Sequence, residues 1–172
     1  MAQRIPGFEF VDSFPVVVPN EYVHRDQLDD FRVLHRSEFY SYNDAITDRN
    51  FFRATTVLTP GRRFIVGLYE ITAEQDSEDC LDFLFNQHAI LVGAHGATLA
   101  YEQGKEKLLK GYWHASFDRA NALHGDADGP LVPIIGRAES GSQYWFNLGL
   151  FTRPWLPGGV ILCFRNIITT PK

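Results

Sequence analysis

The segment "LVGAHGATLAYEQ", residues 91–103, carries residue types suited to holding an anion. A short apolar run leads into Gly93 and Gly96, and a helix-like pattern follows them. In such strand–glycine–helix turns, backbone N–H groups and the helix dipole attract phosphates. His95 stands between the glycines and adds a group that exchanges protons near neutral pH. The G-x-x-G spacing matches neither the dinucleotide fingerprint nor the P-loop, so a plain turn into a helix is the alternative interpretation.

The segment "WHASFD", residues 113–118, contains the three residue types of a hydrolase triad. In a strand, His114, Ser116 and Asp118 share one face, because alternate side chains point the same way. A triad needs the histidine between the serine and the acid, but here the serine lies in the middle. The outer two residues would also be about 13 Å apart at ~3.3 Å per residue. The spacing therefore predicts the polar face of an amphipathic strand, with His114 free to serve a pocket on that face.

The segment "HGDADG", residues 124–129, has the composition of a calcium loop. An EF-hand would place its first aspartate where His124 stands and its bidentate glutamate where Ile135 stands. An EF-hand is therefore excluded. A solvent-exposed turn is the main interpretation, because Asp-Gly pairs are common in turns. A looser calcium site is the alternative, and Asp126 and Asp128 are kept as candidate ligand-binding residues.

Aromatic residues cluster near the C-terminus. Tyr144, Phe146 and Leu148 share one face of a predicted strand, which we expect to be buried. Trp145 points to the opposite face together with Asn147, so it is the aromatic candidate for ligand contact.

No metal site or cofactor is predicted. The six histidines show no H-E-x-x-H or comparable ligand spacing. Cys80 and Cys163 are too few for a disulfide framework or a four-cysteine zinc site, and both lie in apolar surroundings typical of buried thiols. The acids around Asp76 suit a helix start better than a metal site. Catalytic residues stay unassigned. The candidate ligand-binding residues are Gly93, His95, Gly96, His114, Asp126, Asp128 and Trp145.

The composition predicts one globular domain over residues 1–172, since 45% of the residues are hydrophobic and no linker divides the chain. Strands are predicted at 8–11, 14–18, 50–58, 62–71, 89–93, 111–118, 143–151 and 158–167, and helices at 74–87 and 96–109. The two runs in 50–71 read as a β-hairpin around Pro60-Gly61. A short helix between residues 21 and 50 is left open. The predicted class is α+β: a mainly antiparallel or mixed sheet of six or more strands, two to three helices, and a candidate β-α-β unit at 89–117.

The charge and hydropathy of the chain restrict its partners. A net charge of −5 argues against a surface that tracks nucleic acid. No apolar run reaches membrane-spanning length, and the first 20 residues lack the pattern of a secretory signal, so we expect a soluble cytoplasmic protein. The leading hypothesis is a module that binds a small ligand or another protein and forms a homo-oligomer. The alternatives are a small hydrolase-like enzyme with His95 or His114 as general acid/base, and a structural subunit of an assembly.

Overall fold

The structure, a computed structural model, describes residues 6–167. Its strands are β1 (Phe8–Val17), β2 (Phe39–Tyr42), β3 (Arg63–Ile71), β4 (Trp113–Ala115), β5 (His124–Asp126), β6 (Gly129–Arg137), β7 (Tyr144–Leu150) and β8 (Gly159–Asn166). Its α-helices are α1 (Gln27–His35), α2 (Ser77–Asn86) and α3 (Gly93–Gly104). The strands form one mixed sheet in the order β1-β3-β8-β4-β6-β7-β2, with β5 paired to β6. The predicted α+β class is confirmed.

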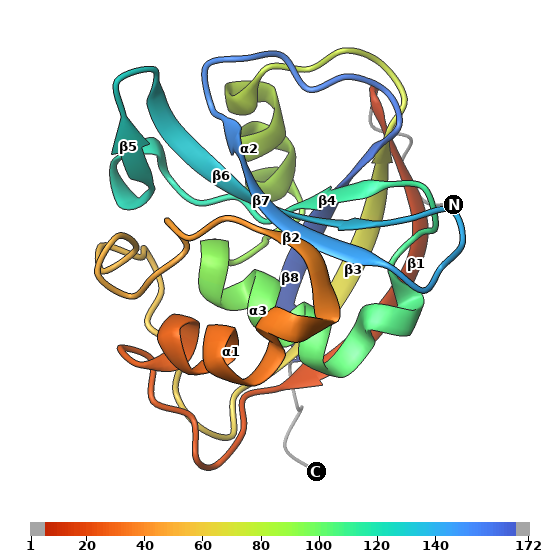
Figure 1. Cartoon of the computed structure of the whole chain (residues 1–172). Helices are drawn as coiled ribbons and strands as arrows, with labels where there is room; N and C mark the ends of the chain where they lie inside the picture. Colours follow the sequence, from red (N-terminus) through yellow and green to blue (C-terminus); the bar gives the residue numbers. More distant parts are fainter. Residues whose placement is uncertain (1–5, 168–172) are drawn as a thin grey trace, which may run out of the picture.

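The sheet has helices on both faces (Figure 1). Along β8, Val160, Leu162 and Phe164 pack into the same cluster as α3, whereas Ile161 and Cys163 pack into the cluster that contains α2. Helix α3 contacts both β1 and β6, which lie far apart in the strand order, so the sheet curves around it. Helix α1 packs on α3 from outside. Ten of the twelve residues of α3 are consequently buried.

Helix α2 starts as the sequence predicts. The Asp76 side chain accepts a hydrogen bond from the backbone N–H of Asp79 at 2.7 Å, and the Asp79 carboxylate accepts one from the N–H of Asp76 at 3.1 Å. This capping box satisfies two N–H groups that the first turn leaves free. The acids at this position therefore serve as caps. Both thiols, Cys80 and Cys163, are buried as predicted.

The predicted hairpin at 50–71 is wrong in its first half. Residues 50–58 form turns, bends and irregular chain, and β3 pairs with β1 and β8 instead. The reason lies in the backbone donors of this segment. The N–H of Thr55 donates to the Asp118 side chain, and the N–H of Leu58 donates to the His24 ring. These two backbone N–H groups are bonded to side chains and so are not available to pair with a neighbouring strand.

The candidate β-α-β unit at 89–117 is also wrong. Only Ile90 makes a bridge, antiparallel to Phe164, and α3 starts at Gly93, three residues earlier than predicted. Strand β4 instead runs parallel to β8. The predicted strands 8–11 and 14–18 are one strand, β1, with a bulge between Phe10 and Asp12. The open helix between residues 21 and 50 is α1.

Two tryptophans lie flat over glycines of neighbouring strands. Trp145 stands directly opposite Gly136 in the β6–β7 ladder, and Trp113 stands opposite Gly159 in the β4–β8 ladder. A Cβ added to Gly136 would lie 1.6 Å from the Trp145 ring, and one added to Gly159 would lie 1.8 Å from the Trp113 ring. Each indole thus covers the strand where glycine leaves the space open.

In the part of the chain that the structure describes, no helix is long and apolar enough to cross a membrane.

Replacing Gly136 by alanine should lower the free energy of unfolding by about 1–3 kcal/mol, since the new methyl group displaces the Trp145 ring. Urea denaturation measures the change, and tryptophan fluorescence of the folded state should shift with it. Gly125→Ala is the matched control in β5, where the nearest atom to an added Cβ is 3.9 Å away. Equal stability of the two variants would contradict the packing of Trp145 on Gly136.

Candidate functional site

The structure separates the seven predicted site residues into distinct places. Gly93, His95 and Gly96 lie in the first turn of α3, whereas His114 lies in β4 and bonds to Leu109, beyond the other end of that helix. A helix of 12 residues is about 18 Å long, so the two histidines serve different ends of it. The β5 hairpin, which carries the aspartates, lies at the margin of the sheet (Figure 1).

His114 is completely buried, with both ring nitrogens bonded to backbone. Its Nδ1 donates to the carbonyl of Ile135 at 3.0 Å, and its Nε2 accepts from the N–H of Leu109 at 2.8 Å. This pair of bonds requires the neutral ring, and burial lowers the pKa of His114 to about 4. The predicted polar face of an amphipathic strand is wrong here, because β4 ends at Ala115 and His114, Ser116 and Asp118 are all buried.

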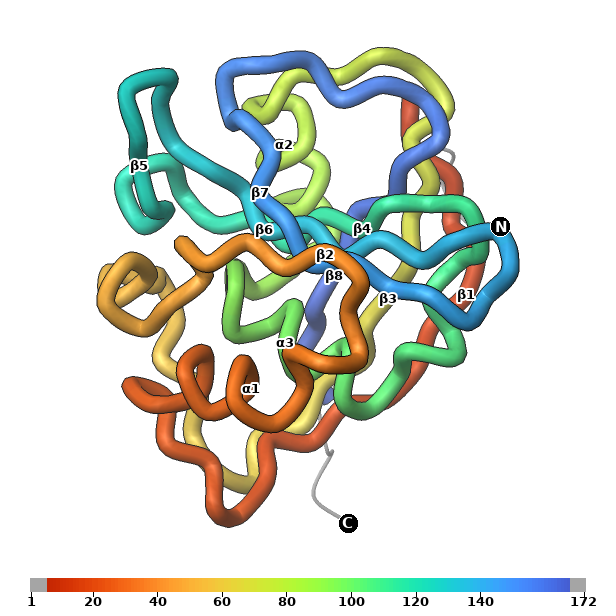
Figure 2. The backbone as a smooth tube through the Cα atoms, viewed as in Figure 1, coloured from red at the N-terminus to blue at the C-terminus, as the bar shows by residue number. Residues whose placement is uncertain are grey.

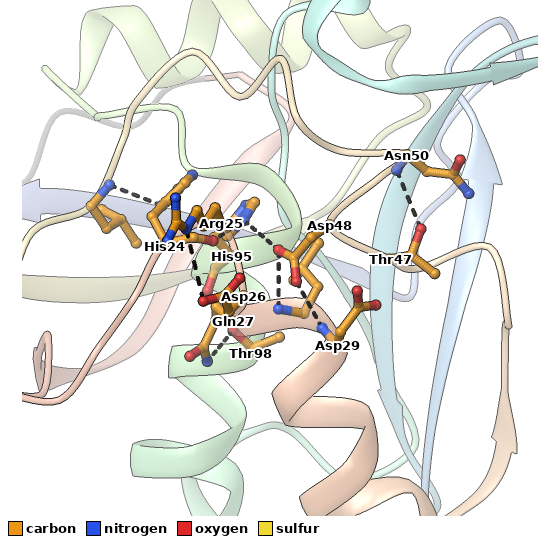
Figure 3. A network of polar contacts seen from close by, with 12 residues as sticks. His24, Arg25, Asp26, Gln27, Asp29, Thr47, Asp48, Asn50, His95 and Thr98 are labelled. Atoms are coloured by element: carbon orange, nitrogen blue, oxygen red, sulfur yellow. Dashed lines mark hydrogen bonds and ion pairs between the residues drawn. The ribbon is translucent and has the colours of Figure 1, made fainter.

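His95 is the centre of a polar cluster beneath two loops, residues 19–26 and 43–62 (Figure 3). Its Nε2 lies 3.1 Å from the carbonyl oxygen of His24 and 3.4 Å from Oδ1 of Asp48. A carbonyl can only accept, so Nε2 of His95 carries a proton. The ring of His95 also stacks on that of His24, with 3.8 Å between centroids and 12° between planes. The imidazole is nearly inaccessible to solvent.

His24 binds the loop that contains Leu58 through its ring nitrogen Nδ1. Its Nδ1 lies 3.1 Å from the backbone N–H of Leu58 and 3.1 Å from the hydroxyl of Tyr22. An N–H group can only donate, so Nδ1 is the acceptor and the neutral ring carries its proton on Nε2. Burial, together with the neighbouring His95, lowers the pKa of His24 to about 4, while Asp48 acts in the opposite direction.

Asp48 caps a helix from a distant loop. Its carboxylate accepts from the N–H groups of Leu28 at 3.2 Å and Asp29 at 2.9 Å, in the first turn of α1. Asp26, the residue at the N-cap position, makes no such bond with its own side chain. A carboxylate at this place satisfies free N–H groups and interacts favourably with the helix dipole. Asp48 therefore joins the loop to α1 and to His95.

Asp118 fixes the same loop at a second point. Its Oδ2 accepts from the N–H of Thr55 at 3.0 Å and its Oδ1 from the N–H of Arg119 at 2.7 Å. Burial raises the pKa of Asp118, and the hydrogen bonds from Thr55 oppose that shift. We call His24, Asp48, His95 and Asp118 the loop anchor.

The first turn of α3 does not offer an open anion cradle. The N–H of Gly93 donates to the carbonyl of Phe117 at 3.2 Å, and Gly93 adopts a left-handed conformation with φ +49°. A Cβ on Gly93 would lie 3.2 Å from that of Asp118, so a buried carboxylate already stands beside the helix start. Gly96 packs under Val92 and Phe164. The glycines therefore allow close packing of the turn.

The remaining candidates have local partners. Oδ1 of Asp126 accepts from the N–H of Asp128 at 2.8 Å, which is ordinary turn chemistry, and both residues are exposed. Trp145 is partly buried and lies 5.9 Å from the ring of Tyr40. Within residues 6–167, no three His, Cys, Asp or Glu side chains are placed to hold a metal ion together.

Sequence reasoning missed His24 and Asp48. Neither belongs to a recognisable motif, and these partners lie 19 to 71 residues away in the chain. Only the fold brings them to α3. No protein-family model matches the chain, and no significant similarity to a curated protein or a solved structure was found.

The buried neutral His114 should make the protein sensitive to acid. Its pKa is lowered to about 4 from 6.5, so the unfolded chain binds the proton more readily, and stability falls as the pH drops from 6.5 towards 4. His114→Leu removes this titration. Between pH 7 and pH 5 the variant should lose about 2 kcal/mol less free energy of unfolding than the wild type, measured by urea denaturation at each pH. Parallel pH curves would show that His114 does not stay neutral in the fold.

Asp48→Ala should lower the free energy of unfolding by about 1–3 kcal/mol, because two N–H groups of α1 and the His95 ring lose a partner. Hydrogen exchange should show faster exchange at Leu28 and Asp29 than in the wild type. Asp44→Ala is the matched control, an exposed aspartate four residues earlier in the same loop. If both variants were equally stable, Asp48 would not act as a cap.

Proposed function

We propose that the chain is a protein-binding module. Its contact surface would be the loop face, which we define as residues 19–26 and 43–62. The observation that carries the proposal is the long loop between β2 and β3. Its 20 residues, 43–62, contain neither helix nor strand. Connections of this length without secondary structure are uncommon in compact domains, and ordered ones usually have a function.

Hydrogen bonds to the residues beneath it hold the loop face in place. Leu58 and Thr55 donate to the side chains of His24 and Asp118, while Asp48 reaches back to α1. Inside the loop, the Asn50 side chain donates to the carbonyl of Ala45 at 2.8 Å. Figure 2 shows the two segments side by side next to α1. A surface ordered before contact loses less conformational entropy on binding, which favours affinity.

The same loops expose large apolar side chains. Phe52 is 74% exposed, Val57 is 61% exposed and Val23 is 46% exposed. Val23 and Val57 directly precede His24 and Leu58, whose hydrogen bond joins the two segments. Exposed aromatic and aliphatic groups on a rigid support are the type of residue that anchors protein interfaces.

The histidines support binding over acid–base catalysis. Both nitrogens of His114 are bonded to backbone in the core, and His95 directs its proton-bearing nitrogen to the carbonyl of His24. A general base needs to reach the proton that it removes. Both rings are instead buried, and the proton-bearing nitrogen of each already donates to a backbone carbonyl.

The double variant Phe52→Ser, Val57→Ser should weaken partner binding strongly while leaving the fold intact. The partner can be a second copy of the chain, so analytical ultracentrifugation of the purified protein comes first. If it is monomeric, affinity capture from the cells that produce it, with mass spectrometry, identifies the partner. Calorimetry with the purified partner should then show Kd raised at least about tenfold in the double variant.

The matched control is Val33→Ser, since Val33 is 83% exposed but lies on α1, outside the loop face. It should bind like the wild type. Equal loss of binding in both variants, or no loss in either, would contradict the assignment of the surface to the loops.

A further inference from the structure

We propose that the loop face opens reversibly in acid, with the stacked pair His24 and His95 as its proton-sensitive latch. The inference rests on the proposed function for what the opening would regulate. The opening itself belongs to the isolated chain and is measured without a partner.

The hydrogen bonds of His24 make it sensitive to a proton. Its Nδ1 accepts from the N–H of Leu58 and lies at the same distance from the Tyr22 hydroxyl, 3.1 Å in each case. A proton on Nδ1 turns this acceptor into a donor, because both nitrogens of an imidazolium carry hydrogen. The N–H of Leu58 would then face another N–H. Protonation therefore removes the side-chain bond that joins residues 19–26 to residues 43–62 at this point.

The stack strengthens the response. The ring centroids of His24 and His95 are 3.8 Å apart, so positive charge on both rings would repel at short range in a partly dehydrated setting. His95 has Asp48 beside its Nε2 to balance one charge, at 3.4 Å. His24 has no carboxylate within ion-pair distance among the described residues.

Several titratable groups face the pair from the elements around it. Asp48 is already bonded to two N–H groups of α1, which holds its carboxylate on the α1 side. The guanidinium of Arg25 is turned to Asp26, at 3.9 Å. The groups facing the latch are Tyr22, Arg25 and Asp26 on its own loop, Asp48 on the longer loop, His95 and Glu102 on α3, and Asp118 after β4. Of these, only Asp48 raises the pKa of His24, and burial outweighs it.

The direction of the pH effect follows from linkage. The closed state lowers the pKa of His24 to about 4, whereas a solvated ring has its ordinary value near 6.5. The contribution of neutral His24 to the closed state of the loops is therefore complete above pH 6.5 and is lost as the pH falls from 6.5 to 4. For one proton, the open fraction should rise about tenfold between pH 6.5 and pH 5.

The test is amide hydrogen exchange by NMR on the isolated, full-length protein from pH 8 to pH 4, corrected for the intrinsic pH dependence of exchange. The Leu58 amide reports the latch, and the amide of Leu68, in the β3–β8 ladder, reports global unfolding. We expect protection at Leu58 to fall about tenfold from pH 6.5 to 5, while Leu68 stays more strongly protected.

His24→Asn separates the proton from the hydrogen bond, because the asparagine oxygen can accept from Leu58 and does not titrate. Protection at Leu58 should then depend little on pH. His88→Asn is the matched control, since His88 is exposed and has a φ of +55°, which asparagine tolerates. It should keep the wild-type profile. If His24→Asn does not fold, the NMR titration of the His24 ring in the wild type must coincide with the Leu58 transition.

Constant protection at Leu58 down to pH 4, or loss only together with Leu68, would overturn the latch. So would a His24→Asn profile that matches the wild type. These outcomes are independent of partner binding. If the latch responds to pH but no partner is found, only the proposed function is refuted. If a partner binds but Leu58 shows no pH response, only this inference is refuted.

Discussion

The burial of α3 inside a curved sheet is the constraint on which the rest of the structure depends. Its small residues let β1, β6 and α1 approach from several sides, and almost all of its surface leaves water. A helix buried this way brings the polar groups of its first turn into the interior. Such groups need hydrogen-bond partners, because an unpaired buried polar group costs about 1–3 kcal/mol. His95 is the largest of them, and the loops supply its partners.

This requirement explains why the loops are irregular and yet fixed. The segment 50–58 has the β-branched and aromatic composition of a strand, but its donors at Thr55 and Leu58 are used by side chains that close the polar cluster. The loop thus exchanges a ladder of hydrogen bonds for a few long-range ones. Its apolar residues Phe52 and Val57 are left outside as a result. Rigidity and exposed apolar surface in the loop face have the same origin.

The sequence was sufficient for features with local causes. Residues 76–79 alone predict the cap of α2, and the continuous apolar run of β3 predicts its burial on both faces. It was insufficient where tertiary contacts decide. Residues 50–58 lost their strand to side chains 34 and 63 residues away. His114 was enclosed by the core, with its ring bonded to Leu109 in the segment that follows α3. Of the loop anchor, the sequence predicted His95 as a site residue and placed Asp118 on a polar strand face with Ser116. His24 and Asp48 were not predicted as site residues, since no spacing rule links residues that meet only in the fold.

Three histidines illustrate how much the environment decides. His114 and His24 each accept a backbone N–H on one nitrogen, and this role is possible only for a neutral ring. His95 instead donates from Nε2 to a carbonyl that lies beside a carboxylate. The same side chain therefore serves as a fixed core acceptor, as an acceptor at the loop surface, and as a donor at a helix start. His114 is sealed in the core, so its protonation requires global unfolding. His24 is only partly buried beneath the loops, so its protonation requires only a local displacement, and acid should reach it first.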